Sequence, residues 1–314
     1  MSIIHHILSF FLVFESFMGD LSDLQSITAS EIENYADLKS WTGVLKDYVG
    51  KTLESKKTWY SAVADAYNRV RPRYPQEIIT RAITIAQLHN SAKILEIGCG
   101  PAIATIPLAE LGFSMVSLEP NWEASKIAKL NCAAYPQVQI INTSFEEWDL
   151  IENQFDAVLA ATSWHWLDPA IAYRKSAAAL KSAGHLILLW NTPPQLDLAT
   201  YQLVDSVYQA LAPEIPLYAR HEGRETHQAD FLKFSESIIN SGYFANVKYD
   251  HSILNVTYSV EEYLLLLSTL SPYIALAEEK RTHVFANVQE ILRHHRGEYL
   301  NLSFISAFHV ARKI

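Results

Sequence analysis

The sequence predicts an α/β protein with a doubly wound, Rossmann-like sheet of seven strands. From residue 93 onward, short apolar runs alternate with helical patterns, which is typical of a parallel sheet with helices on both faces. Several runs, such as HLILLW, are apolar throughout, as expected for strands buried on both faces. A glycine-containing turn, IGCGP, follows the first of these runs. With 314 residues the chain is long enough for one such domain with insertions.

The segment before the sheet is expected to be helical. Residues 60–74 (YSAVADAYNRVRPRY) predict a helix that ends at the Arg-Pro step, because proline cannot continue it. Residues 76–89 carry apolar side chains at helical spacing and lead into the first strand. Residues 20–58 are polar with scattered apolar positions and are expected to hold short helices.

The alternating pattern then predicts the sheet element by element. Strands are expected at 93–98, 114–119, 138–142, 155–161 and 184–191, with helices at 101–111, 122–133 and 169–181. Beyond residue 194 the rhythm changes, and we expect helices at 198–211, 230–240, 259–270 and 276–295 and strands at 245–257 and 300–311. We interpret the late helices as a cap inserted at about 195–243 and 259–297 within one domain, 59–314.

Residues 1–58 are expected to lie outside that domain. Residues 3–17 are largely apolar, but they lack a basic n-region and a clear cleavage site and are short for a membrane span. We interpret the first 17 residues as a loose tail, or as the product of a start site upstream of a true start at Met18. No stable membrane anchor is expected.

Composition narrows the class of function. A net charge of −9 argues against a nucleic-acid-binding surface, which needs clustered Lys and Arg. The two cysteines, Cys99 and Cys132, do not form a disulfide framework and fit a reducing, cytoplasmic compartment. The twelve histidines show no metal-ligand spacing, so no metal site is expected.

The stretch KILEIGCGPAIAT, residues 93–105, indicates a small-molecule site. Gly98 and Gly100 let the backbone approach a ligand closely. The helix that follows offers unpaired N–H groups and a positive dipole end. A dinucleotide site would need a third glycine where the chain has Ile103, so an NAD(P)-dependent oxidoreductase is the less favoured alternative.

The same stretch resembles the first motif of class I S-adenosylmethionine (SAM)-dependent methyltransferases, with Ala102 in place of the motif's last glycine. The segments VSLEP, NTSFEEWDL and FDAVLAATSWHWLD resemble later motifs of these enzymes. Together with the Y-x-x-x-R-P-x-Y-P segment, they look most like the type 11, trans-aconitate methyltransferase-like branch. The resemblance implies methyl transfer from SAM to a small-molecule acceptor, with S-adenosylhomocysteine as the second product. A non-catalytic SAM-binding protein is a further alternative.

The resemblance also implies roles for particular residues. Glu119 would bind the ribose hydroxyls, although a NAD site also uses an acid here. Glu96 would lie under the methionine end of SAM or accept only backbone hydrogen bonds, and Arg71 would pair with the methionine carboxylate or face solvent. The expected cofactor-binding residues are Tyr67, Arg71, Glu96, Gly98, Cys99, Gly100, Glu119, Pro120, Ser144, Phe145 and Ala161.

Acceptor-side candidates follow the fourth strand and lie in the cap. His165 is a candidate general base, or else a hydrogen-bonded structural histidine. Trp164 and Trp166 flank it at the carboxyl edge of the sheet, and one of them is expected to be a packing residue. Arg220 and Arg224 suit bidentate binding of an acidic substrate, although a solvated loop fits their acidic neighbours better. The acceptor atom and the oligomeric state are not predicted.

Overall fold

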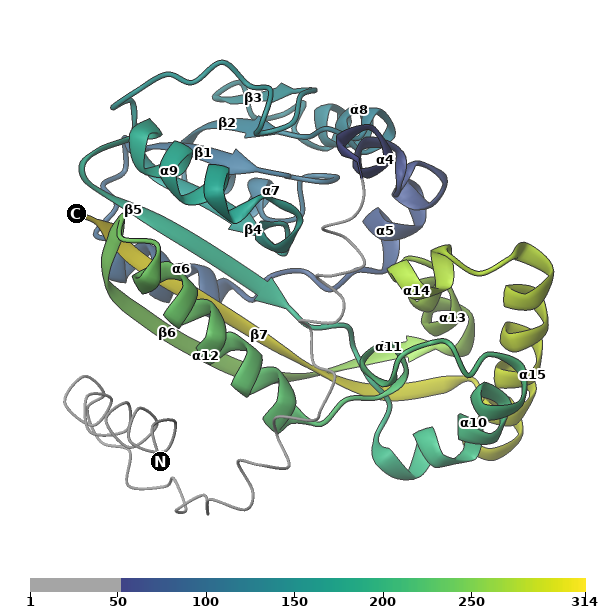
Figure 1. Ribbon diagram of the computed structural model, residues 1–314. Coiled ribbons are helices and arrows are strands. Elements are labelled where there is room, and N and C mark those ends of the chain that lie inside the picture. Colours follow the sequence, from purple (N-terminus) through teal and green to yellow (C-terminus); the bar gives the residue numbers. More distant parts are fainter. Residues whose placement is uncertain (1–51) are drawn as a thin grey trace, which may run out of the picture. The chain divides into compact units, whose positions relative to one another are not determined.

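The computed structural model describes residues 52–314, and its centre is a seven-stranded sheet in the order β3-β2-β1-β4-β5-β7-β6 (Figure 1). β7 runs antiparallel to both of its neighbours, whereas the pairs from β3 to β5 are parallel. The predicted fold class is therefore confirmed. The strands are β1 (Lys93–Ile97), β2 (Ser114–Leu118), β3 (Val138–Ile141), β4 (Phe155–Ala161), β5 (Leu180–Asn191), β6 (Phe244–Ser259) and β7 (Tyr299–Lys313).

Helices cover both faces of this sheet (Figure 1). Alternate side chains of one strand supply the two cores: Leu95 packs in the core of one face and Ile94 in the core of the other. One face carries α6 (Gln76–Ile85), α7 (Thr105–Glu110) and α8 (Trp122–Asn131), and the other carries α9 (Pro169–Ala179) and α12 (Arg224–Asn240).

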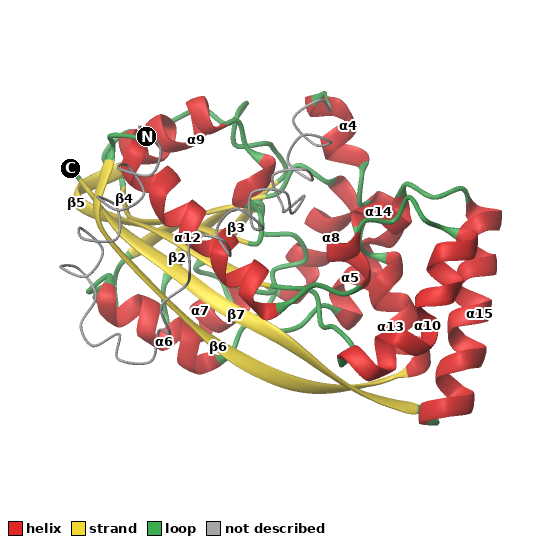
Figure 2. Ribbon diagram, turned by 60° about the horizontal axis from the view of Figure 1, so that its bottom comes forward, coloured by secondary structure: helices red, strands yellow, loops and turns green. Residues whose placement is uncertain are grey.

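The cap has its own hydrophobic cluster, which includes Tyr263, Val288 and Leu292. β6 and β7 continue beyond the other strands to reach it (Figure 2), and Leu300 and Leu302 of β7 belong to this cluster. The cap helices are α10 (Leu198–Leu211), α11 (Leu217–Arg220), α13 (Val260–Ser268), α14 (Ser271–Ile274) and α15 (Glu278–Arg296).

α12 differs from the prediction in two respects. It begins at Arg224 instead of residue 230, and it packs on the sheet through Phe231 and Ile238 although it lies inside the predicted cap range 195–243. It is therefore a helix of the sheet layer.

The segment that precedes the sheet is divided into three short elements. They are α4 (Leu53–Thr58), a 3-10 turn η1 (Ser61–Val63) and α5 (Ala64–Val70). α5 ends before Arg71, which is extended with ψ 137°, as expected for a residue that precedes proline. The predicted end at the Arg-Pro step is therefore confirmed, whereas the first part of the single helix predicted from residue 60 is the 3-10 turn η1. The predictions for residues 1–51 lie outside the described residues.

Within residues 52–314, no helix combines the length and the apolar character that a bilayer crossing requires.

Candidate active site

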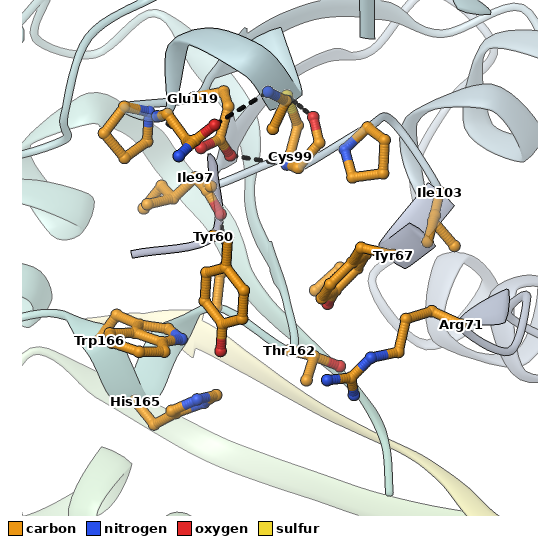
Figure 3. A pocket seen from close by; sticks show the side chains of 18 of the residues that line it. Tyr60, Tyr67, Arg71, Ile97, Cys99, Ile103, Glu119, Thr162, His165 and Trp166 are labelled. Atoms are coloured by element: carbon orange, nitrogen blue, oxygen red, sulfur yellow. Dashed lines mark hydrogen bonds between the residues drawn. The ribbon is translucent and has the colours of Figure 1, made fainter. Parts of the chain in front are cut away.

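A cavity lies at the carboxyl ends of the parallel strands, where ligands bind in sheets of this type (Figure 3). Its walls come from the turn after β1, the end of β2, the segment after β3 and the 3-10 turn η2 (Trp164–Trp166) after β4. The opposite walls come from α4, α5 and the start of α14. Every predicted cofactor-binding residue lines this cavity except Glu96.

Both glycines of the turn have the left-handed backbone that favours glycine, and they differ in what lies beside them. Gly98 has a φ of +65°, and a Cβ placed there would lie 2.8 Å from Cβ of Ser163. Gly100 has a φ of +55° and open space where a Cβ would stand. Ala102, where the motif's last glycine is expected, has a φ of +73° and is fully buried. The turn therefore keeps a glycine-type backbone at Ala102 despite the methyl group.

Glu119 is held in the cavity wall by backbone hydrogen bonds. Its Oε2 accepts from the N–H of Gly100 at 2.7 Å, and its Oε1 accepts from the N–H of Asn121 at 2.8 Å. Burial raises the pKa of Glu119 to about 7, against the effect of these two bonds. Each oxygen retains a second lone pair for a ligand.

Glu96 lies beneath the turn and has no exposed surface. Its Oε2 accepts hydrogen bonds from the Thr105 hydroxyl at 2.6 Å and the Ser117 hydroxyl at 2.9 Å. Burial raises its pKa to about 7, with the two hydroxyls opposing that shift. Glu96 supports the turn from below through hydroxyl partners, which differs from the predicted alternative of backbone hydrogen bonds alone.

The segment after β3 closes the far end of the cavity. Ser144 accepts a hydrogen bond from the N–H of Glu147 at 3.2 Å and donates one to its Oε2 at 2.9 Å. Phe145 is buried and stacks on Trp148, with ring centroids 6.4 Å apart. These contacts fix a polar side chain and an aromatic ring side by side in the wall.

Arg71 points into the cavity beside Tyr67, and its guanidinium lies 4.7 Å from the centroid of that ring (Figure 3). Its Nε donates to the Thr269 hydroxyl at 2.9 Å, and its Nη2 donates to the Thr269 carbonyl at 2.8 Å. No carboxylate pairs with Arg71 among residues 52–314. The remaining N–H groups of this cation are therefore available to an anion.

The residues after β4 divide into packing and lining residues. Trp164 is buried against Tyr173, with ring centroids 5.1 Å apart, so it is the packing tryptophan of the pair. Trp166 and His165 line the cavity (Figure 3). Burial, together with the charge of Arg71, lowers the pKa of His165 to about 3. An imidazole with so low a pKa is neutral at pH 7 and a weak proton acceptor.

Arg220 and Arg224 do not line this cavity. Arg220 contacts Asp205, with Nη1 3.4 Å from Oδ1, and Arg224 contacts the Ser303 hydroxyl at 3.4 Å. The substrate-binding role considered for these two arginines is thus not supported at this site.

Several lining residues were missed because their contacts join distant parts of the chain. The Tyr60 hydroxyl lies 3.0 Å from the Ser271 hydroxyl, and Lys56 donates to the carbonyl of Trp166 at 2.7 Å. No motif at Lys56, Tyr60 or Ser271 signals these two contacts. Thr162 was also missed. Its polar side chain directly after β4 was the one sequence feature that could have indicated a cavity-lining residue. In the described part of the chain, no cluster of His, Cys, Asp or Glu is arranged to hold a metal ion.

Comparisons with known proteins find similarity to methyltransferases. A family model described as a methyltransferase domain matches residues 95–188. Uncharacterized methyltransferases of Mycobacterium tuberculosis and Mycobacterium bovis are 36% identical over 133 residues, which are 42% of this chain and 52% of theirs. The chain thus spans about half the length of these relatives.

Two further proteins match over most of the chain. An uncharacterized methyltransferase-like protein of Schizosaccharomyces pombe is 25% identical over 245 residues, covering 76% of this chain and 86% of that protein. The solved structure of a protein described as a type II methyltransferase from Anaeromyxobacter dehalogenans is similar with a TM-score of 0.57 at 20% identity. That similarity covers 77% of this chain and 97% of the other, and it shows a shared fold.

Proposed function

We propose that this chain is a class I SAM-dependent methyltransferase that transfers the methyl group of SAM to a small-molecule acceptor. The methyltransferase domain matched over residues 95–188 and the shared fold support this proposal. One observation carries the proposal. The glycine turn, Glu119 and the segment at Ser144 and Phe145, three separate stretches of sequence, line a single cavity. The net charge of −9 and the aromatic walls of the cavity favour a small molecule over a nucleic acid.

The residues of the cavity fit SAM. Open space at Gly100 lets a ligand approach the backbone, and the free lone pairs of Glu119 suit the two ribose hydroxyls. The available N–H groups of Arg71 suit a carboxylate such as that of methionine. We assign the adenine end to Ser144 and Phe145, the ribose to Glu119 and Pro120, and the methionine end to Tyr67, Arg71, Gly98, Cys99, Gly100 and Ala161.

SAM supplies a sulfonium methyl group that is already electrophilic when it is bound. The protein's contribution is then alignment and exclusion of water. Tyr60 and Trp166 wall the cavity across from the glycine turn (Figure 3). Because His165 is neutral and weakly basic, we assign it no proton transfer. The acceptor we propose has a reacting atom that is nucleophilic without help from a protein base.

Titration calorimetry with SAM, S-adenosylhomocysteine and NAD tests the cofactor. We expect the first two to bind and NAD not to bind. Glu119→Ala should weaken SAM binding by about tenfold or more, because both ribose hydrogen bonds are lost. The matched control is Glu123→Ala, a partly exposed acid of α8 that pairs with Lys126 and does not line the cavity, which should leave the affinity unchanged. Binding of NAD alone would overturn the proposal in favour of an oxidoreductase.

Incubation of the protein with labelled SAM and a cell extract tests the reaction. We expect a molecule that passes an ultrafiltration membrane to gain the mass of one methylene. Binding of SAM without any labelled product would indicate a non-catalytic SAM-binding protein, and label retained on macromolecules would contradict a small acceptor.

We further propose a cytoplasmic location, supported by the cysteines. Cys99 and Cys132 are both free, buried thiols, as expected in a reducing compartment. Fractionation of cells that express the full chain would test this placement, and recovery outside the cytoplasmic fraction would contradict it.

A further inference from the structure

Thr162, directly after β4, has a backbone conformation that β-branched residues rarely adopt. Its φ is +52°, in the left-handed region that favours glycine. The residue lines the cavity (Figure 3). Strained conformations of this kind persist only where surrounding contacts impose them, and they concentrate at functional sites.

Those contacts come from two other parts of the chain. The Thr162 hydroxyl lies 2.6 Å from the Tyr74 hydroxyl and accepts from the N–H of Asn191 at 3.2 Å. The Thr162 N–H donates to the carbonyl of Leu189 at 2.8 Å. Asn191 is itself held by its side-chain amide, which donates to the carbonyl of Pro72 at 3.0 Å. The hydroxyl of Thr162 therefore joins β4 and β5 to the RPRYP segment.

Tyr74 is suited to this contact because it stays protonated. It is buried, and burial raises the pKa of its phenol well above the usual range. The raised pKa favours the protonated phenol, which can donate a hydrogen bond to the Thr162 hydroxyl.

The strained turn places the next residue against the glycine turn. Ser163 donates from its hydroxyl to the carbonyl of Ile97 at 2.5 Å. Its Cβ occupies the space that a Cβ on Gly98 would need, 2.8 Å away. Gly98 and Ser163 therefore form one continuous part of the cavity wall, and the direction of the chain at Thr162 determines where that wall lies.

We propose that Thr162 is a positioning residue for the methyl donor: held by Tyr74 and Asn191, it sets the wall formed by Ser163 and Gly98 on which SAM lies. The assignment rests on the proposed function, because it concerns the same cavity. Thr162 lies outside the glycine turn and was not among the predicted cofactor-binding or acceptor-side residues. The RPRYP segment thereby gains a second role, holding Thr162 through Tyr74, besides the role of Arg71 in binding a carboxylate.

The test compares three variants for SAM affinity by calorimetry, each first shown to be folded by its urea unfolding curve. Thr162→Val keeps the shape and the branched Cβ but removes the hydroxyl, and it should weaken SAM binding about tenfold. Thr162→Ser keeps the hydroxyl and should bind within about threefold of the wild type. Tyr74→Phe leaves Thr162 in place but removes its partner, and it should also weaken binding.

The matched control is Thr200→Val, which removes a buried hydroxyl that bonds Asp197 in the cap, away from the cavity. It should lower stability without changing SAM affinity. If Thr162 had a purely structural role, Thr162→Val would likewise lower stability without changing SAM affinity. Normal SAM affinity of Thr162→Val would therefore overturn the assignment. Equal weakening in Thr162→Ser and Thr162→Val would also overturn it. Absence of SAM binding by the wild type would instead overturn the proposed function, and this assignment with it.

Discussion

Ala102 shows how a single residue of the glycine turn balances two opposing effects. Its left-handed backbone, with φ +73°, costs an alanine about 1–2 kcal/mol relative to the usual conformations. Its methyl group is fully buried in a cluster with Cys99, Ala128 and Cys132, which offsets about 0.8 kcal/mol. The side chain is therefore tolerated because it is small.

Substitutions at Ala102 should separate these two effects. Ala102→Gly should change the free energy of unfolding by less than about 1 kcal/mol, because relief of the backbone strain offsets the lost methyl group and the entropy of glycine. Ala102→Val should lower it by about 2–4 kcal/mol, because a branched residue is disfavoured in this conformation and overfills the cluster. Urea unfolding measures both values. A valine variant as stable as the wild type would show that the turn is free to change its backbone.

Glu96 makes the stability of the protein depend on pH. Burial raises its pKa from the ordinary 4.5 to about 7, so the folded state holds a proton that the unfolded state has released. Relative to an ionised Glu96, this proton stabilises the folded state. The stabilisation is fully present below pH 4.5 and is lost as the pH rises through 7. The shift corresponds to a free energy on the order of 3 kcal/mol.

Glu96→Gln should remove that dependence, because its amide oxygen can still accept from Thr105 and Ser117. Relative to the wild type, the variant should become more stable as the pH rises from about 4 to about 8. Chemical unfolding at both pH values measures the difference. A constant offset between the two proteins would mean that folding leaves the pKa of Glu96 unchanged.

At the scale of elements, agreement between sequence and structure follows the physical source of each signal. Strands buried on both faces are mostly apolar, and β4, apolar except for Asp156, was predicted at its observed ends, 155–161. The start of α12 was missed because its first residues are polar and Gly223 has no side chain with which to cap the helix. The helix predicted from residue 60 ends at the Arg-Pro step as expected, but its first part is the 3-10 turn η1.

The same reasoning separates predictable from unpredictable site residues. Gly98, Gly100 and Glu119 lie on local motifs whose spacing follows from a strand, a turn and a helix. Tyr60 and Ser271 meet across 211 positions of the chain, and no local pattern encodes such a contact. The contributions of Tyr60 and Ser271 to the cavity therefore emerged only from the structure, whereas His165 and Trp166 were predicted from their place after β4.

Asn121 connects two elements, and its loss should affect both. Its side-chain oxygen caps α8 by accepting from the N–H of Ala124 at 3.0 Å. Its amide nitrogen donates to the carbonyl of Lys57 at 2.8 Å and to the Ser61 hydroxyl at 2.9 Å, which fastens α4 and η1 beside the cavity. Asn121→Ala should lower stability by about 1–3 kcal/mol and increase proteolytic cleavage near α4.

Asp168→Ala is the matched control for that prediction. Asp168 caps α9 by accepting from the N–H of Ala170 at 2.9 Å, but within the described residues no hydrogen bond joins it to α4 or η1. Asp168→Ala should lower the free energy of unfolding by about 1 kcal/mol and leave cleavage near α4 unchanged. Equal cleavage in both variants would show that α4 is held by its other contacts, such as the bond from Lys56 to Trp166.

At the scale of the whole molecule, two strands join the cap to the sheet. Leu300 and Leu302, at the start of β7, belong to the cap cluster, whereas Phe308 and Val310 of the same strand belong to the core of the sheet. β6 pairs with β7 along both parts, from Phe244 to Ser259 (Figure 2). Loss of the cap would therefore remove packing from strands that the sheet also needs.

This continuity predicts that cap and sheet unfold together, and one substitution in each cluster tests it. Leu292→Ala in the cap and Leu188→Ala in the sheet each empty a fully buried site and should cost about 2–5 kcal/mol. If the two clusters are coupled through β6 and β7, both variants should show one thermal transition, shifted to lower temperature, with equal calorimetric and van't Hoff enthalpies. An early separate transition in Leu292→Ala, absent from Leu188→Ala, would show instead that the cap unfolds by itself. In that case the walls that α14 contributes to the cavity would open without loss of the sheet, and ligand access would be governed by the stability of the cap.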